Sequence, residues 1–86
     1  MTDIFDKLPR KILEILYFNR NKLYVYKITR LGNISHAQTY KTIKMLKEKG
    51  LVETEVKGRR RYVELTEKGK KAVKLISKLK KMWEDA

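Results

Sequence analysis

The chain of 86 residues contains no cysteine, one histidine and one proline. Disulfide scaffolds and zinc fingers are therefore excluded, because both are built from several cysteine or histidine side chains. The longest uninterrupted apolar runs, such as residues 15–18, are far shorter than the roughly 20 residues that cross a bilayer. The N-terminus also lacks the basic-then-apolar order of a secretory signal. These absences predict a soluble, cytoplasmic protein with no metal, no cofactor and no membrane contact.

Acidic residues are scarce as well. The chain has 22 Lys and Arg against 10 Asp and Glu, which gives a formal net charge of +12. So large a charge on a small chain repels itself, and a polyanion is the partner that most readily turns this repulsion into binding. We therefore expect a single domain over residues 1–86 that binds nucleic acid. With one His, no Cys and no clustered carboxylates, no general acid–base pair is available, so we expect that the protein is not an enzyme.

Helical spacing of apolar residues predicts two helices in the first third of the chain. The first covers about 7–18, with Asp6 placed as its N-cap. Residues 19–22 form a polar turn, and the helical period returns over 24–31 until Gly32. This pattern predicts a short second helix of about two turns.

A third helix is expected after a short loop. Ser35 and Gln38 have the spacing of a capping box, in which each side chain satisfies a free N–H group at the helix start. Ile43 and Leu46 fall on the inward face, and the helix ends before Gly50. The expected third helix therefore covers about 35–49.

The hydrophobic period then changes from about 3.6 residues to 2. Apolar and polar residues alternate over 52–56 and again over 62–65, which predicts two strands of one hairpin. Their connection, residues 57–61, contains one glycine and four cations, so this tip must face solvent or an anion. A last helix over 66–84 is capped by Thr66.

This order of elements predicts an α+β, mostly α fold: a winged helix-turn-helix with a three-helix core, a two-stranded β-hairpin wing and a long C-terminal dimerisation helix. Residues 34–52 resemble the recognition helix and first wing strand of small winged-helix transcription regulators. Residues 65–69 (LTEKG) resemble the strand-to-helix junction of the MarR and PadR families. The short wing and single closing helix are similar to those of compact regulators from hyperthermophilic archaea and their viruses. The resemblance implies a transcription regulator, associated with the nucleoid or, for a viral protein, located in the host cytoplasm.

In such a fold the third helix enters the major groove of DNA, and the side chains that face away from the core read base edges. Gln38 can pair with adenine, and Lys41 or Lys44 can reach guanine or phosphate. The Thr42 methyl group or the Tyr40 ring can touch a thymine methyl group. Similar regulators carry a Tyr-Arg-Thr or Tyr-Lys-Thr triplet on this face, and this resemblance favours residues 40–42 as a contact cluster. Two alternatives stay open: Gln38 only closes the capping box, and Tyr40 packs against the second helix. The predicted DNA-binding residues before the hairpin are Lys27, Arg30, Ser35, His36, Gln38, Tyr40, Lys41, Thr42 and Lys44.

The cationic hairpin tip predicts a second contact with DNA. Arginine side chains fit the narrow, strongly negative minor groove of A·T-rich DNA. We therefore expect Arg59, Arg60 and Arg61 to enter this groove, with Lys57 on a phosphate. The alternative is an ordinary solvated turn. Three consecutive arginines would also suit RNA, because attraction to phosphate does not distinguish the two polymers.

The last helix is about 28 Å long, more than the preceding core can cover. An apolar stripe continues along its distal half, and a two-fold dimer in which this helix packs against its symmetry mate would cover the stripe. The two recognition helices would then lie ~34 Å apart, which is one turn of DNA. A basic helix with a Met-Trp end could instead enter an anionic membrane, although the stripe joins the folded core directly, as a dimer interface should. The predicted dimer interface consists of Leu75, Ile76, Leu79, Met82 and Trp83.

Together these features predict a homodimer that binds double-stranded DNA with sequence preference and regulates transcription. No small-molecule ligand is expected, because so small a domain offers no evident effector pocket. Two other functions stay open from the sequence. One is an architectural protein that coats DNA without sequence preference, and the other is a winged-helix adaptor that binds other proteins.

Overall fold

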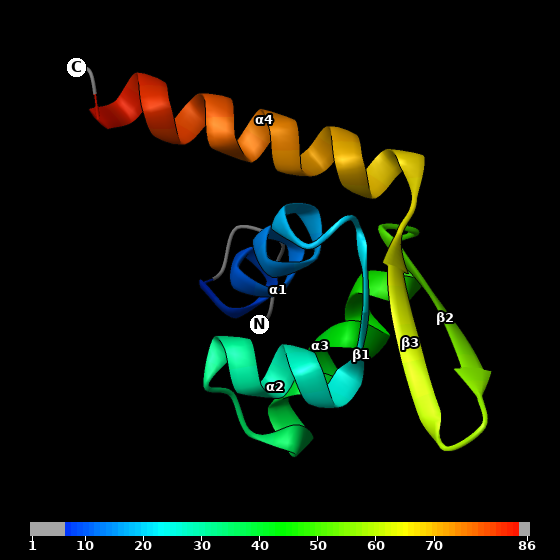
Figure 1. The fold of residues 1–86 in the computed structure, drawn as a ribbon. Coiled ribbons are helices and arrows are strands. Elements are labelled where there is room, and N and C mark those ends of the chain that lie inside the picture. Colours follow the sequence, from blue (N-terminus) through cyan, green and yellow to red (C-terminus); the bar gives the residue numbers. More distant parts are fainter. Residues whose placement is uncertain (1–6, 85–86) are drawn as a thin grey trace.

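The computed structural model describes residues 7–84, except for the side chains of Trp83 and Glu84. Within these described residues, seven elements follow one another (Figure 1): α1 (Lys7–Phe18), β1 (Lys22–Tyr24), α2 (Val25–Gly32), α3 (His36–Glu48), β2 (Val52–Lys57), β3 (Arg60–Leu65) and α4 (Glu67–Glu84). The four predicted helices are confirmed, and each predicted boundary agrees with the structure within about one residue. The predicted cap Asp6 lies outside the described residues.

Helix α1 lies at the centre of the fold. In Figure 1, α4 crosses on one side of α1, α2 and α3 lie on the other side, and the sheet flanks these helices. Ile12, Leu13 and Leu16 of α1 are fully buried, because their spacing places them on one face of the helix. The side chains that meet them in the core include Ile28, Leu46, Val63 and Val73. This shared core fixes α3 relative to the wing.

The sheet has three antiparallel strands in the order β1-β3-β2. Strand β1 corrects the sequence prediction, which placed residues 22–24 in a turn and at the start of the second helix. Arg20 and Asn21 have positive φ angles of 64° and 69° that reverse the chain after α1. Strand β1 then pairs with β3, with Leu23 opposite Val63. Three residues are too few to display a period of 2, so β1 leaves no pattern in the sequence.

Strands β2 and β3 form the predicted hairpin, but their connection is shorter than predicted. Strand pairing continues to Lys57, which lies opposite Arg60, and only Gly58 and Arg59 remain in the loop. The φ angle of Gly58 is +60°, as the first position of a two-residue type II′ turn requires. The prediction of a longer cationic tip is therefore wrong. Because successive side chains of a strand point to opposite faces, Arg60 and Arg61 lie on opposite faces of the wing.

The junction between β3 and α4 depends on a close backbone contact. Thr66 caps α4 by accepting a hydrogen bond from the N–H of Gly69 (3.0 Å), and its hydroxyl donates to the carbonyl oxygen of Gly50 (2.6 Å). The same residue's N–H donates to the carbonyl oxygen of Leu51 (3.1 Å). A methyl group added at Gly69 would clash with this Leu51 oxygen. Gly69 is thus needed for the junction, whereas the sequence alone indicates only a small loss of helix stability.

We expect the Gly69→Ala substitution to lower the free energy of unfolding by about 1–3 kcal/mol, because the added methyl group must displace backbone. Helix propensity alone predicts the opposite sign, a gain of about 1 kcal/mol. Urea unfolding followed by circular dichroism measures the difference. The control is Lys71→Ala, an exposed position on the same helix, for which we expect a change within about 0.5 kcal/mol. A Gly69→Ala protein that matches or exceeds the parent in stability would contradict the close contact.

Helix α4 buries only one face against the rest of the protomer. Val73 and Ile76 belong to the core, with exposed fractions of 0% and 6%. Ile76 was predicted to lie in a dimer interface, and this prediction is wrong because the protomer itself buries the side chain. Leu75, Leu79 and Met82 are 62%, 55% and 63% exposed. Within residues 7–84, no helix has the length and apolar character needed to span a membrane.

Candidate nucleic-acid interface

Helices α2 and α3 are joined by a tight turn that sets the start of α3. Asn33 adopts the left-handed conformation (φ 51°) after α2. Ser35 is the N-cap of α3, and its hydroxyl oxygen accepts a hydrogen bond from the backbone N–H of Gln38 (3.2 Å). The Ser35 half of the predicted capping box is therefore confirmed. The backbone of Gln38 makes this contact, and its side chain is exposed.

The buried face of α3 is partly polar. Thr39 and Thr42 are 0% and 4% exposed, and their hydroxyls donate to the carbonyl oxygens of Ser35 (2.8 Å) and Gln38 (2.7 Å). These local bonds satisfy both hydroxyl donors in the core. The predicted contact between the Thr42 methyl group and thymine is therefore wrong, since this side chain is buried. The buried positions of α3 have helical spacing: 39, 42, 43 and 46. This helical period alone could have placed Thr42 on the buried face.

The opposite face of α3 is exposed and cationic. His36, Gln38, Tyr40, Lys41 and Lys44 are all exposed, as the sequence predicts. Lys27 and Arg30 of α2 and the N-cap Ser35 are exposed beside them. Residues 15–47 include seven Lys or Arg and no Asp or Glu. A polyanion that approaches this face therefore meets no carboxylate from α2 or from α3 up to Lys47.

Three aromatic side chains form a row across α2 and α3. The rings of Tyr26 and His36 lie 6.1 Å apart with planes inclined by 29°, and those of His36 and Tyr40 lie 6.3 Å apart with planes inclined by 27°. We call Tyr26, His36 and Tyr40 the aromatic row. For Tyr40, packing against the second helix was the alternative to a DNA contact. Its ring stacks on His36 of α3 and remains 44% exposed. Tyr26, which is 51% exposed, was not among the predicted contacts, because in the sequence only the cations of α2 indicate DNA binding.

An arginine lies over each end of the aromatic row. The guanidinium of Arg30 lies 5.8 Å from the ring centre of Tyr26, and its Nη1 donates to the Tyr26 hydroxyl (3.2 Å). This hydrogen bond, together with the electrostatic attraction of the Tyr26 phenolic oxygen, raises the pKa of Arg30 above its ordinary value. At the other end, the guanidinium of Arg61 on β3 lies 5.7 Å from the ring centre of Tyr40. Cation–π contacts of this kind hold both guanidinium groups against the face of α2 and α3.

A hollow of about 460 Å³ separates α3 from the wing. Its floor includes Ile43, and Lys47 reaches across it, with its Nζ donating to the Thr54 hydroxyl of β2 (3.2 Å). Lys47 was not predicted as a site residue, because a sequence does not reveal which cation faces the wing. The residues that line this α3–wing hollow are Tyr40, Lys41, Ile43, Lys44, Lys47, Thr54 and Arg61. Four of these seven side chains are cations, so the hollow suits an anionic group.

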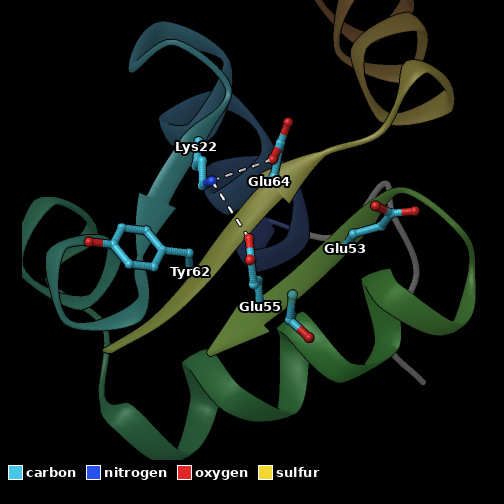
Figure 2. A pocket seen from close by; sticks show the side chains of 6 residues that line it. Lys22, Glu53, Glu55, Tyr62 and Glu64 are labelled. Atoms are coloured by element: carbon cyan, nitrogen blue, oxygen red, sulfur yellow. Dashed lines mark ion pairs between the residues drawn. The ribbon is translucent and has the colours of Figure 1, made fainter. Parts of the chain in front are cut away.

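The outer face of the sheet has a different character. Figure 2 shows Lys22 between Glu55 and Glu64, with nitrogen–oxygen distances of 3.8 and 3.9 Å. Glu53 lies opposite Glu64 in the strand register, and these side chains line a hollow of about 260 Å³. Because the ion pairs are largely exposed, each adds little to stability. The carboxylates of the wing therefore lie on the face away from Arg61.

The predicted wing cations are not all brought together. Arg60 lies on the outer sheet face, with its guanidinium 4.5 Å from the ring centre of Tyr24. Lys57 lies on the same face and pairs weakly with Glu55 (3.9 Å). Arg61 faces α3, and Arg59 occupies the loop. All four side chains are exposed, so the wing presents cations in three directions rather than as one cluster.

A comparison with protein-family models identifies the fold family. The model described as the DUF6293 C-terminal winged helix domain matches residues 17–77, from the end of α1 into α4. The chain belongs to this family. The match includes the whole of α2, α3 and the sheet, so the surface described above lies entirely within the winged helix domain. The predicted winged helix-turn-helix class is confirmed by the family and by the observed order of elements.

Several solved structures are similar to this chain. AF1382 from Archaeoglobus fulgidus is 28% identical, with a TM-score of 0.86 over 94% of this chain and 92% of its own. A transcriptional regulator homologue from Pyrococcus horikoshii is 26% identical, with a TM-score of 0.75 over 91% of this chain and 83% of its own.

A MarR family transcriptional regulator from Silicibacter pomeroyi is 33% identical, with a TM-score of 0.73 over 81% of this chain and 47% of its own. This chain therefore spans about half the length of that regulator. The predicted resemblance to MarR-type regulators is confirmed. The compact archaeal proteins match the present winged helix domain over nearly their whole length.

Proposed function

We propose that this winged helix domain is a transcription regulator that binds double-stranded DNA as a homodimer. The observation that carries the proposal is the exposed face of α3, where Lys41 and Lys44 border the α3–wing hollow together with Lys47 and Arg61. A helix and a wing with cations between them fit the curved, anionic surface of a duplex. The similar proteins titled as transcription regulators support the same class of function. The proposed role of this surface is to bind DNA, and no catalytic step is part of it.

Helix α3 acts as the recognition helix in this proposal. Its 13 residues give a length of about 20 Å, which the major groove admits. Lys41 and Lys44 reach guanine or phosphate, and the exposed side chain of Gln38 reads adenine. Ser35 and His36 at the helix start, with Lys27 and Arg30 on α2, contact the flanking phosphates.

The wing supplies the second contact. Arg59 occupies the hairpin loop and enters the adjacent minor groove. Lys57 and Arg60 stand opposite each other at the base of the loop, where they bind the phosphates on either side of that groove. Arg61 belongs with α3 instead, because its guanidinium lies over Tyr40.

A second copy of the chain covers the exposed stripe of α4. Leu75, Leu79 and Met82 follow each other at spacings of four and three residues, which is the seam of a two-stranded helical packing. The stripe lies roughly a third of a turn from the core residues Val73 and Ile76, so both surfaces can be covered at once. More than half of each stripe side chain is exposed in the protomer. Two-fold pairing of α4 would bury the stripe and present two α3 helices ~34 Å apart to a palindromic site.

Selection of bound sequences from random duplex DNA tests the proposal. We expect one palindromic motif to be enriched, with an affinity more than about 10³-fold above that for random duplex. Enrichment without a motif, with a ratio under about tenfold, would indicate an architectural DNA-coating protein instead. Retention of no duplex at all would indicate a winged-helix adaptor that binds other proteins.

A further inference from the structure

The aromatic row is more exposed than a packing role requires. Tyr26 and Tyr40 are 51% and 44% exposed, and His36 between them is also exposed. The two tyrosines come from different helices, and their planes follow that of His36 within 29°. Apolar surface that is exposed and contiguous often marks a binding site, whereas single exposed side chains need no explanation.

The ends of the row carry positive charge from two further positions. Arg30 lies over Tyr26 and donates a hydrogen bond to its hydroxyl, and Arg61 lies over Tyr40 from the wing. The complete arrangement therefore consists of three neighbouring rings with one guanidinium group at each end, contributed by α2, α3 and β3. Residues 15–47 contribute no carboxylate beside it. An elongated anion with flat apolar groups matches this arrangement in both charge and shape.

A DNA duplex offers no base face that could stack on these rings. Its bases are stacked on one another inside the helix, and the major groove exposes only their edges. An unpaired base offers its whole face, and stacking of one base on one aromatic side chain contributes roughly 5- to 150-fold in affinity. Aromatic rings beside cations are the recurring surface of proteins that bind single strands.

We propose that the aromatic row, with Arg30 and Arg61, is a binding site for single-stranded DNA. Unpaired bases stack on Tyr26, His36 and Tyr40, and the two guanidinium groups bind the phosphates that connect them. Because α3 also carries the proposed duplex contacts, a single strand and a duplex compete for this face. The inference goes beyond duplex binding and rests on the geometry of the row alone.

An abasic strand provides the first test. The intact protein is titrated with fluorescently labelled oligo(dT) and with an oligonucleotide of the same length and charge whose bases are missing. We expect oligo(dT) to bind at least tenfold more tightly, because only that strand can stack. Equal affinity for the two strands would overturn the proposal. Tighter binding of oligo(rU) than of oligo(dT) would overturn the assignment to DNA.

Substitution of the row provides the second test. Tyr26→Leu combined with Tyr40→Leu removes two rings from exposed helical positions without changing the charge, and we expect at least a tenfold loss of oligo(dT) affinity. The control is Tyr62→Leu, an aromatic residue on the outer sheet face, which should bind oligo(dT) within threefold of the parent. Equal losses in both proteins would overturn the proposal. The parent protein, titrated with oligo(dT) and with duplex in parallel, separates the two proposals: a parent that binds duplex but not oligo(dT) refutes only this one, and a parent that binds oligo(dT) but not duplex refutes only the proposed function.

Discussion

We expect the joint replacement of Lys41, Lys44 and Arg61 with alanine to lower the affinity for duplex DNA at least about a hundredfold. The three cations border the α3–wing hollow, and each contact with a base edge is worth about 1–3 kcal/mol. All three side chains are exposed, so the protein should keep its fold. Fluorescence anisotropy with a labelled duplex at fixed salt measures the loss, and circular dichroism confirms that the helices remain.

The matched control removes the same charge from α4. Lys70, Lys74 and Lys81 lie in one row of α4 at helical spacing, away from the α3–wing hollow. Their replacement with alanine lowers the net charge equally, so any general attraction to DNA weakens to the same extent. We expect this control to lose less than about tenfold in affinity. Similar losses in the two triple variants would show that net charge, and not the face of α3 and the wing, determines binding.

The Leu79→Glu substitution converts the proposed dimer into protomers. Leu79 lies in the middle of the exposed α4 stripe and is 55% exposed in the protomer, so a carboxylate there is tolerated by the single chain. In the dimer the same carboxylate would be buried beside its symmetry mate, which is strongly unfavourable. Sedimentation analysis should give the protomer mass of 10.3 kDa for the variant and twice that mass for the parent.

Loss of the dimer also changes DNA binding. Linked protomers bind a palindrome with an effective local concentration in the millimolar range, so we expect Leu79→Glu to weaken binding to a two-half-site duplex at least about a hundredfold. Affinity for a single half-site should be unchanged. Ser77→Glu is the control, because it adds the same charge at an exposed position on another face of α4. A parent protein that sediments as a protomer, or a variant that remains dimeric, would contradict the α4 interface.

Most of the fold could be predicted from the sequence because its helices carry redundant signals. Helix α3 has a capping serine, a helical apolar period and a glycine at its end, and all three agree on its bounds. Strand β1 has none of these signals. Its three residues become a strand only because the reversal at Arg20 and Asn21 brings them beside β3, so tertiary contacts decide their conformation.

The candidate functional surface was harder to predict than the fold, because it depends on the face of a strand or helix on which each side chain lies. Four of the residues 57–61 are cations, yet strand pairing up to Lys57 and Arg60 places these two side chains on the outer face of the sheet and Arg61 on the face toward α3. The apolar residues of α4 likewise belong to two different surfaces, since Ile76 is buried in the core while Leu75 is exposed. The aromatic row escaped prediction because Tyr26 and Tyr40 are 14 positions apart and meet through His36 only once α2 and α3 pack.

The salt dependence of duplex binding tests the central claim most directly. If α3 and the wing of two protomers neutralise about 8–10 phosphates, the logarithm of the association constant falls with the logarithm of salt concentration with a slope of about −7 to −9. Anisotropy titrations from low to physiological salt with the selected duplex measure this slope. A slope near zero would show that the cations of α3 and the wing do not bind the phosphate backbone, and would contradict DNA binding by this surface.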